Sequence, residues 1–259
     1  MDLIFLGDII GNQAIHSAID FIQNNQEANQ SSFRIANVEN ASGGFGLTEE
    51  HYQQLTRGGF DILSGGNHIW DKKEIFHYIG KSKIARPYNL PQGTPGAGWQ
   101  IVEKEGVKIG LINLLGRVFM SVSALDCPFR SCDRAIEELR AQGVRAIFVD
   151  IHAEASSEKQ ALGYYLDGRV TAVIGTHTHV QTADERLLPK GTAFITDAGP
   201  CAAYDSVIGM SPESILPKFL TGLPGRAEAS KKPVRVHGVK VRFDQASGLA
   251  HGISRLASS

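Results

Sequence analysis

The sequence predicts an α/β protein with parallel strands in its sheet. Strand-like and helix-like patterns alternate along the chain, and two successive β-α units occupy the N-terminal part. With 259 residues, of which 42% are hydrophobic, the chain can bury a full core without covalent staples. No internal repeat, low-complexity tract or convincing linker divides it, so we expect one domain over residues 1–259.

The first half of the chain reads as strands and helices in turn. An apolar strand-like run at 3–7 comes first, and Ile15, Ile19 and Ile22 then recur at helical spacing. Thr48 is a suitable N-cap for the next helix, which glycines follow. The other predicted elements are strands at 33–39 and 60–66 and helices at 48–59 and 71–80, the last beginning on Asp71.

The second half has a different pattern. Residues 98–116 read as a hairpin that turns at Glu105-Gly106. A Pro/Gly-rich stretch at 87–98 predicts a long surface loop, and a polar loop follows at 117–131. The remaining predictions are helices at 132–142 and near 157–167, and strands at 146–152, 170–179, 192–196 and 234–244.

Composition and charge exclude several classes of protein. A net charge of -1 implies no strongly basic face, so we expect no extended nucleic-acid surface, although a local phosphate pocket stays compatible. No stretch approaches the apolar length of a membrane span. The chain opens on a strand-like segment, and its three cysteines lie in no C-x-x-C pair. We therefore expect a cytoplasmic protein with reduced thiols.

Polar side chains that can bind a cation lie at the carboxyl ends of five of the predicted strands. In chain order they are Asp8, then Glu39 with Asn40, Asn67 with His68, His152, and finally His177 with His179. The carboxyl ends of parallel strands open on one side of a sheet, so these side chains should meet in one crevice. Mixed carboxylate, amide and imidazole ligands suit Mn, Fe or Zn better than a thiolate-selecting metal. The pattern predicts a metal site.

Each of these residues also has a simpler explanation when taken alone. Asp8 can cap the following helix, Glu39-Asn40 can form a turn, and a single His152 can be structural. The pair His177 and His179 is more specific, because His-x-His on an extended segment projects both imidazoles to one side. The coincidence at five strand ends favours the metal site over these alternatives.

Asp8, Glu39-Asn40, the GGNH motif, a lone histidine and the GTHTH motif, in this order, resemble the calcineurin-like metallophosphoesterase superfamily. The closer resemblance is to its YmdB-like branch, whose members resemble 2′,3′-cyclic-nucleotide phosphodiesterases. It covers nearly the whole chain, through FLGDIIG, NVENASGGFGLT, GGNHIWD, RPYN, INLLGRVFM, TDAGP and YDSVIGM. The resemblance implies a four-layer α/β/β/α sandwich, in which helices flank two facing sheets.

The resemblance also implies two divalent metal ions, which are iron or manganese in the family analogues. One would be held by Asp8, Glu39, Asn40 and His179. The other would be held by Glu39, Asn67, His152 and His177, with Glu39 bridging the two. His68 would be the catalytic acid.

Three positions depart from the pattern of the broader superfamily. Ile10 stands where the usual D-x-H motif has its histidine, NVEN replaces G-D-x-x-D, and Ile69 replaces the acidic residue that often follows GNH. The YmdB-like branch shares these departures. They leave open which group orients His68, since Asp71 is one candidate but can equally cap its helix.

The chemistry of these residues agrees with a hydrolase. Two metal ions can share a water and lower its pKa, so that the bridging hydroxide attacks phosphorus while His68 protonates the leaving alkoxide. We expect a metal-dependent phosphodiesterase whose small-molecule partner is a phosphodiester, foremost a 2′,3′-cyclic nucleotide. The alternatives are a phosphomonoesterase or 5′-nucleotidase on the same site, and a metal-binding regulatory protein that acts through RNA or a protein partner. A homo-oligomer is compatible with the sequence.

Overall fold

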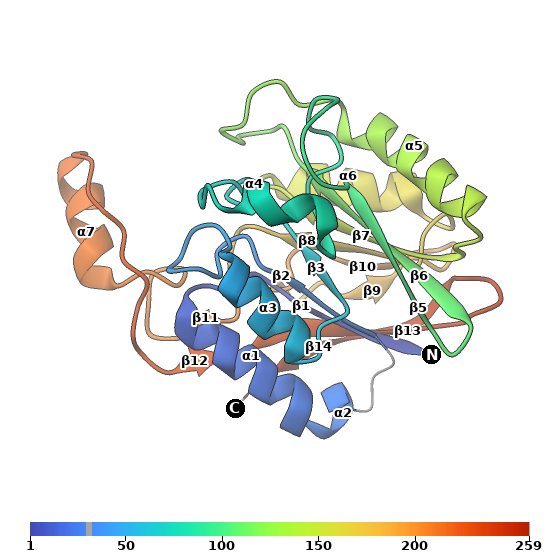
Figure 1. Ribbon diagram of the computed structural model, residues 1–259, viewed down its shortest axis with the longest axis horizontal. Coiled ribbons are helices and arrows are strands. Elements are labelled where there is room, and N and C mark those ends of the chain that lie inside the picture. Colours follow the sequence, from blue (N-terminus) through green and yellow to red (C-terminus); the bar gives the residue numbers. More distant parts are fainter. Residues whose placement is uncertain (30–32, 259) are drawn as a thin grey trace.

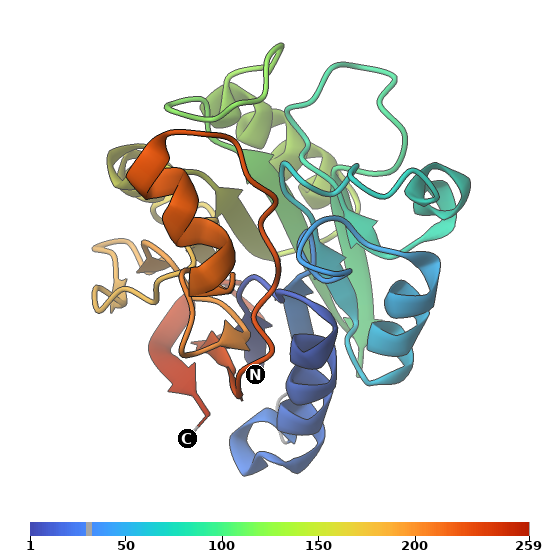
Figure 2. The ribbon, with the colours of Figure 1, turned by 90° about the vertical axis from the view of Figure 1, so that its left-hand side faces the viewer.

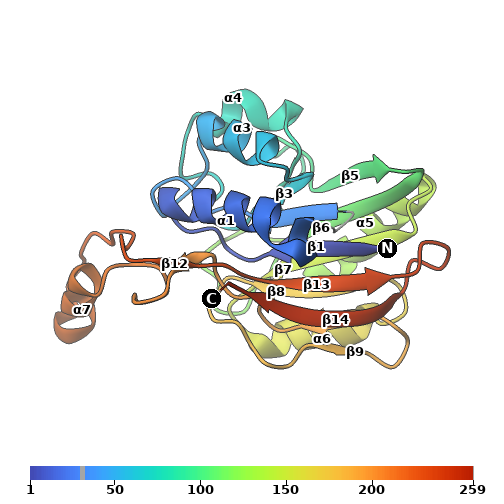
Figure 3. The same cartoon turned by 90° about the horizontal axis from the view of Figure 1, so that it is seen from below.

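The computed structural model describes residues 1–29 and 33–258, which form four layers (Figures 1 and 3). Within these residues two six-stranded sheets face each other, and helices cover the outer face of each sheet. The α/β class predicted from the sequence and the four-layer sandwich implied by the resemblance are both confirmed.

The first sheet contains the N-terminal strands and the C-terminal hairpin. Its order is β14 (Ala250–Ala257), β13 (His237–Phe243), β1 (Asp2–Leu6), β2 (Phe33–Asn37), β3 (Ile62–Ser64) and β4 (Ile84–Ala85). The strands β1 to β4 are parallel, whereas β13 pairs antiparallel with both β1 and β14. The parallel part places the carboxyl ends of β1, β2 and β3 side by side.

The second sheet contains the middle of the chain. Its order is β5 (Trp99–Lys104), β6 (Val107–Leu115), β7 (Ala146–His152), β8 (Ala172–Thr176), β10 (Ala193–Ile195) and β9 (Arg186–Leu187). The inner four strands are parallel, and the two outer strands are antiparallel to their neighbours. The hairpin predicted at Glu105-Gly106 is confirmed, and both residues have the positive φ that a tight two-residue turn requires.

Most of the helices cover the outer faces of the two sheets. The helices are α1 (Asn12–Asn24), α2 (Gln26–Asn29), α3 (Glu49–Arg57), α4 (Ile75–Tyr78), a 3-10 turn (Ile79–Lys81), α5 (Pro128–Ala141), α6 (Ser156–Leu166) and α7 (Pro212–Thr221). Apolar residues of α1, α3 and α4 pack on the first sheet, and those of α5 and α6 pack on the second. Thr48 is the N-cap of α3, as predicted, and its side chain accepts a hydrogen bond from the backbone N–H of His51.

Alternation along each strand separates the apolar core into layers. Leu3 and Phe5 of β1 pack between the sheets, together with Phe148 of β7. Ile4 and Leu6 point the other way and pack against the helices on the outer face. The same alternation turns polar side chains near the strand ends toward the space between the sheets.

The structure corrects several predicted elements. No helix begins on Asp71: the described helix is Ile75–Tyr78, because Asp71 turns its carboxylate toward His68 instead of a helix N-terminus. The helix predicted at 132–142 starts earlier, with Pro128 in its first turn, a position that proline favours. The unexpected elements include β4, β9, β14, α7 and β11 (Ala202–Ala203). The strand predicted at 234–244 is divided into β12 (Val234–Arg235) and β13.

Helix α7 projects away from the four layers (Figures 1 and 3), and in Figure 2 this orange helix lies in front of them. None of its ten described residues is buried. Phe219 and Leu220 are 76% and 83% exposed, so large apolar side chains of this arm contact solvent. Among residues 1–29 and 33–258, no helix, α7 included, has both the length and the apolar character needed to cross a membrane.

Candidate metal centre

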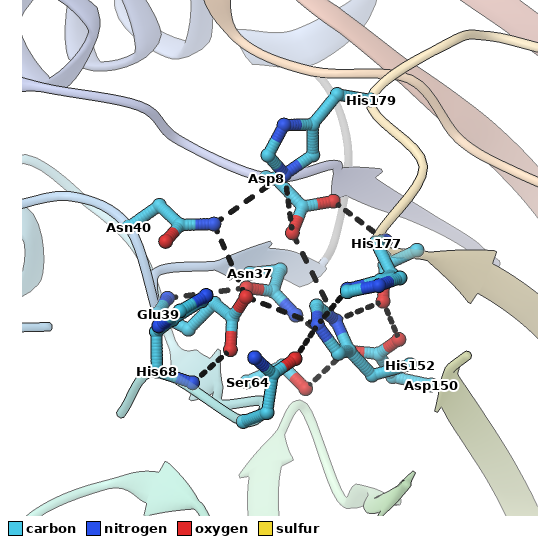
Figure 4. A network of polar contacts seen from close by, with 12 residues as sticks. Asp8, Asn37, Glu39, Asn40, Ser64, His68, Asp150, His152, His177 and His179 are labelled. Carbon is cyan, nitrogen blue, oxygen red and sulfur yellow. Dashed lines mark hydrogen bonds and ion pairs between the residues drawn. The ribbon is translucent and has the colours of Figure 1, made fainter. Parts of the chain in front are cut away.

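The predicted strand ends meet where the carboxyl edges of the two sheets face each other (Figure 4). β1, β2 and β3 of the first sheet, and β7 and β8 of the second, deliver the side chains. The structure brings together Asp8, Glu39, Asn40, Asn67, His152, His177 and His179, with His68 at the edge of the group. Asp8 does not cap α1, whose N-cap is Gly11.

Three potential ligand atoms surround Nε2 of His152. Glu39 Oε1, Asn67 Oδ1 and His177 Nδ1 each lie 3.0 Å from it. His152 and Glu39 are fully buried. Ligand atoms of Glu39, His152 and His177 all lie within 4.8 Å of one another. The spacing fits several donors directed at one common point.

The hydrogen bonds behind His152 decide what its Nε2 can do. Thr176 Oγ1 donates to Asp150 Oδ1 at 2.6 Å, so it accepts from His152 Nδ1–H at 2.9 Å. In the neutral imidazole Nε2 then carries a lone pair, which faces the oxygens of Glu39 and Asn67. Such converging lone pairs are favourable only around a cation, either a proton or a metal ion.

A second group of donors surrounds Asp8. His179 Nε2 lies 3.5 Å from Asp8 Oδ1 and 3.4 Å from the Asn40 amide, whose other contact is Glu39 Oε1 at 3.1 Å. Asp8 Oδ1 and Asn40 Oδ1 are buried and have no hydrogen-bond partner among the described residues. Unpaired buried acceptors are costly unless a donor or a cation satisfies them.

The pKa values reflect this concentration of charge. Burial tends to raise the pKa of Asp8, but His179 and His152 outweigh it and hold that pKa well below its ordinary value. Burial tends to lower the pKa of His152, yet Glu39 and Asp8 raise it to about 9. Burial and the neighbouring His152 lower the pKa of His177 to about 4. A proton on His152 therefore balances the two carboxylates when no metal ion does.

These observations test whether a divalent cation fits the centre. The donors are carboxylate and amide oxygens and imidazole nitrogens, a set suited to Mn, Fe or Zn. Positive charge would stabilise the oxygens of Asp8 and Asn40 that accept no hydrogen bond among the described residues. It would also stabilise the lone pairs that face Nε2 of His152. The residues present fit divalent metal ions.

The two histidines of GTHTH reach the site by a different geometry from the one predicted. β8 ends at Thr176, so His177 and His179 do not lie on an extended strand. Both have positive φ, 98° and 56°, which is rare for residues with a Cβ and which costs free energy. The loop, not the alternation of a strand, places both imidazoles at the centre.

The glycines of GGNH allow the backbone to pass close to the ligands. A Cβ on Gly66 would lie 2.1 Å from Glu39 Oε2 and 2.9 Å from a His152 ring carbon. No side chain fits there without displacing both. The next residues then present Asn67 to His152, while the backbone N–H of His68 donates to Glu39 Oε2 at 2.7 Å. Ile69 is fully buried in the core beneath.

The side chain of Asp71 makes the polar contact to the ring of His68. Asp71 Oδ2 lies 2.8 Å from His68 Nδ1, and both side chains are partly exposed. The carboxylate accepts the Nδ1 hydrogen and leaves Nε2 as the ring nitrogen available to a substrate. Phe45 packs edge-on against the imidazole, with ring centroids 5.1 Å apart. Asp71 is therefore the residue that orients the imidazole of His68, and Phe45 packs against its side.

Sequence reasoning missed a layer of buried polar residues beneath the candidate ligands. Asp150 accepts from Asn37 Nδ2, Asn113 Nδ2, the Ser64 hydroxyl and Thr176 Oγ1, so its carboxylate joins the two sheets. Burial raises the pKa of Asp150 to about 6 despite these donors. The available signal was spacing: Asn37 and Asp150 each lie two residues before a site residue. Asp150 and His152 share one face of β7, whereas Glu39 lies just after the end of β2.

Glu154 was missed as well. Its Oε2 lies 3.2 Å from His177 Nε2, while His177 Nδ1 faces the centre. A carboxylate on the far nitrogen of a ligand histidine fixes the tautomer and the orientation of the ring.

Comparison with known proteins identifies a shared family. The model of the family described as YmdB-like protein matches residues 4–256. A Bacillus subtilis (strain 168) protein named 2′,3′-cyclic-nucleotide 2′-phosphodiesterase is 44% identical over 257 residues, which are 99% of this chain and 96% of the relative.

Two crystal structures resemble the whole chain. A hypothetical protein from Thermus thermophilus is 38% identical with a TM-score of 0.90, and the match covers 100% of this chain and 99% of that one. A novel phosphatase of Mycoplasma pneumoniae is 32% identical with a TM-score of 0.93, over 100% and 93% of the two chains. Both matches therefore include the segments outside the four layers as well as the layers themselves.

Proposed function

This chain belongs to the YmdB-like protein family, and on that basis we propose that it is a metal-dependent phosphodiesterase acting on small phosphodiesters, foremost 2′,3′-cyclic nucleotides. The observation that carries the proposal is the convergence of Glu39, His152 and His177 within 4.8 Å of one another. The name of the Bacillus subtilis relative supports the substrate class.

We propose two divalent cations, iron or manganese, held by two overlapping groups of side chains. One group is Asp8, Glu39, Asn40 and His179, and the other is Glu39, Asn67, His152 and His177. Divalent ions supply a nucleophile from water at neutral pH and offset the charge of the phosphoryl oxygens. Glu39 is the shared residue, because Oε1 contacts both Asn40 and His152.

His68 is the proposed general acid. Its backbone is tied to the centre through Glu39, whereas its imidazole is held by Asp71 and Phe45 rather than by another candidate ligand. It can therefore deliver a proton from Nε2 to the leaving alkoxide without giving up a metal contact. The ribose hydroxyl of a 2′,3′-cyclic phosphate is a poor leaving group, so this proton matters to the reaction.

Turnover by the manganese-loaded protein tests the proposal. We expect hydrolysis of 2′,3′-cyclic AMP and of bis(p-nitrophenyl) phosphate to exceed that of p-nitrophenyl phosphate, and Asp8→Ala to abolish all three. Faster turnover of the monoester would favour a phosphomonoesterase, the alternative suggested by the relative named as a phosphatase. Protein with full metal occupancy that hydrolyses none of them would refute the enzyme and favour a regulatory role through RNA or a protein partner.

A homo-oligomer and a cytoplasmic location complete the proposal. The free thiols of Cys127, Cys132 and Cys201 support a reducing compartment.

The exposed helix α7 supports the oligomer. None of its described residues is buried, and a helix this short is only marginally stable in water by itself. This protein also has a pocket of about 640 Å³, lined in part by Val180, Tyr204 and Ile208. All three side chains are more than half exposed. The arm of a second copy would cover both apolar surfaces.

We expect Phe219→Asp to lower the molar mass measured by light scattering, because a charge on the arm disfavours its burial. The matched control is Phe119→Asp, a change at a similarly solvent-exposed phenylalanine that lies in a loop outside the arm. A wild-type protein that is monomeric, or an unchanged mass in Phe219→Asp, would contradict the oligomer.

A further inference from the structure

We propose that a buried ion pair outside the ligand set positions the histidine loop for both metal ions. The pair is Lys159 of α6 with Asp197, which follows β10, and its contact residue on the loop is Thr178. We call these three residues the Asp197 clamp. The inference rests on the proposed metal centre and adds positioning residues to it.

The loop needs an external support. His177 and His179 both have positive φ, which side chains with a Cβ rarely adopt and which persists only where the surroundings enforce it. Between them lies Thr178. Whatever fixes the backbone of Thr178 therefore fixes the direction of both imidazoles, and these belong to different proposed metal ions.

Asp197 supplies that support through one oxygen. Asp197 Oδ2 accepts from the Thr178 backbone N–H at 3.1 Å and from the Thr178 hydroxyl at 2.7 Å. The other oxygen, Oδ1, accepts from the backbone N–H of Gly199 at 2.9 Å. The carboxylate thereby joins the histidine loop to the segment after β10. That segment reaches the centre as well, because Cys201 N–H donates to the backbone carbonyl of Asp8 at 2.9 Å.

Lys159 provides the positive charge that allows the carboxylate of Asp197 to be buried beside the histidine loop. Lys159 Nζ lies 2.9 Å from Asp197 Oδ2, and both side chains are completely buried. A buried carboxylate without a counter-charge is strongly destabilising, so the lysine compensates the charge that holds the loop. Its stem fills the space beside Gly175, where an added Cβ would lie 2.9 Å from Lys159 Cδ.

A purely structural pair would stabilise the fold without changing metal binding. The clamp makes a different prediction, because its hydrogen bonds end on the residue between the two histidines. Loosening Thr178 should weaken the binding of both metal ions together. Loss of a hydrogen bond that supports metal ligands from outside the ligand set typically lowers metal affinity by about 10–100-fold.

Calorimetric titration of the metal-free full chain with Mn²⁺ alone tests the clamp, because it measures the affinity of each binding step. We expect Thr178→Val to weaken both binding steps by about 10–100-fold, since it removes one of the two hydrogen bonds to Asp197. Thr178→Ser keeps the hydroxyl and should restore wild-type affinity. The matched control is Thr171→Val, which removes the hydrogen bonds of a buried hydroxyl just before β8, at the other end of that strand.

A second variant removes the whole charge pair. Lys159→Met combined with Asp197→Leu leaves no unpaired buried charge, and it should weaken Mn²⁺ binding at least as much as Thr178→Val. If this variant does not fold, the comparison of Thr178→Val with Thr171→Val still decides. Equal affinities in wild type, Thr178→Val and Thr171→Val would overturn the clamp. Wild-type protein that binds no Mn²⁺ would instead refute the proposed metal centre.

Discussion

Replacing His68 with alanine is expected to lower kcat for 2′,3′-cyclic AMP by about 10²–10⁴-fold, the usual contribution of a positioned general acid. The loss should be far smaller for bis(p-nitrophenyl) phosphate. Its nitrophenolate leaves without a proton, whereas the ribose alkoxide needs one. The comparison of the two substrates in steady-state kinetics therefore isolates proton donation from every other effect of the substitution.

Two controls accompany the His68 variant. Its manganese content should equal that of the wild type, because the imidazole contacts Asp71 and Phe45 and no candidate ligand side chain. Asp71→Asn should show the same dependence on the leaving group, with a smaller loss, since it disturbs only the orientation of the ring. Equal losses on both substrates would contradict a general acid and would place His68 in substrate binding.

The location of the centre was predictable because it follows from alternation and topology. Parallel strands end at one edge, so Asp8, Glu39 and His152 had to approach one another once their strands were identified. The carboxylate, amide and imidazole side chains themselves indicated a candidate cation site. The prediction of four layers came from the family resemblance, because nothing in the local sequence patterns indicates that the second half of the chain forms a separate sheet.

What the sequence did not reveal depends on contacts between distant segments. Thr178 meets Asp197, and Asp150 meets Asn37, only after the sheets have packed. The backbone of His177 was misjudged because period-2 spacing cannot show that the strand stops at Thr176. Asp71 looked like a helix cap because the same side chain serves either role, and its partner His68 decided between them.

Protein kept metal-free by a chelator is expected to lose stability as pH rises from 6.5 to 9. The pKa of His152 is raised from 6.5 to about 9, mainly by Glu39 acting against burial. Below pH 6.5 both the folded and the unfolded chain carry this proton, so the stabilisation is fully present. Between these values only the folded chain holds it, and stability falls by up to about 3 kcal/mol.

A bound metal ion should remove this pH dependence, because a divalent cation takes the place of the proton among Glu39, Asn67 and His177. The measurement is the free energy of unfolding in denaturant at pH 6.5, 7.5 and 9, with chelator and with manganese. His152→Asn should make the chelated curve shallower, whereas a change at the exposed His251 should not. His179, whose pKa Asp8 raises against the effect of burial, adds to the fall in the same direction. Parallel curves with and without metal would show that the cation does not bind where His152 holds its proton.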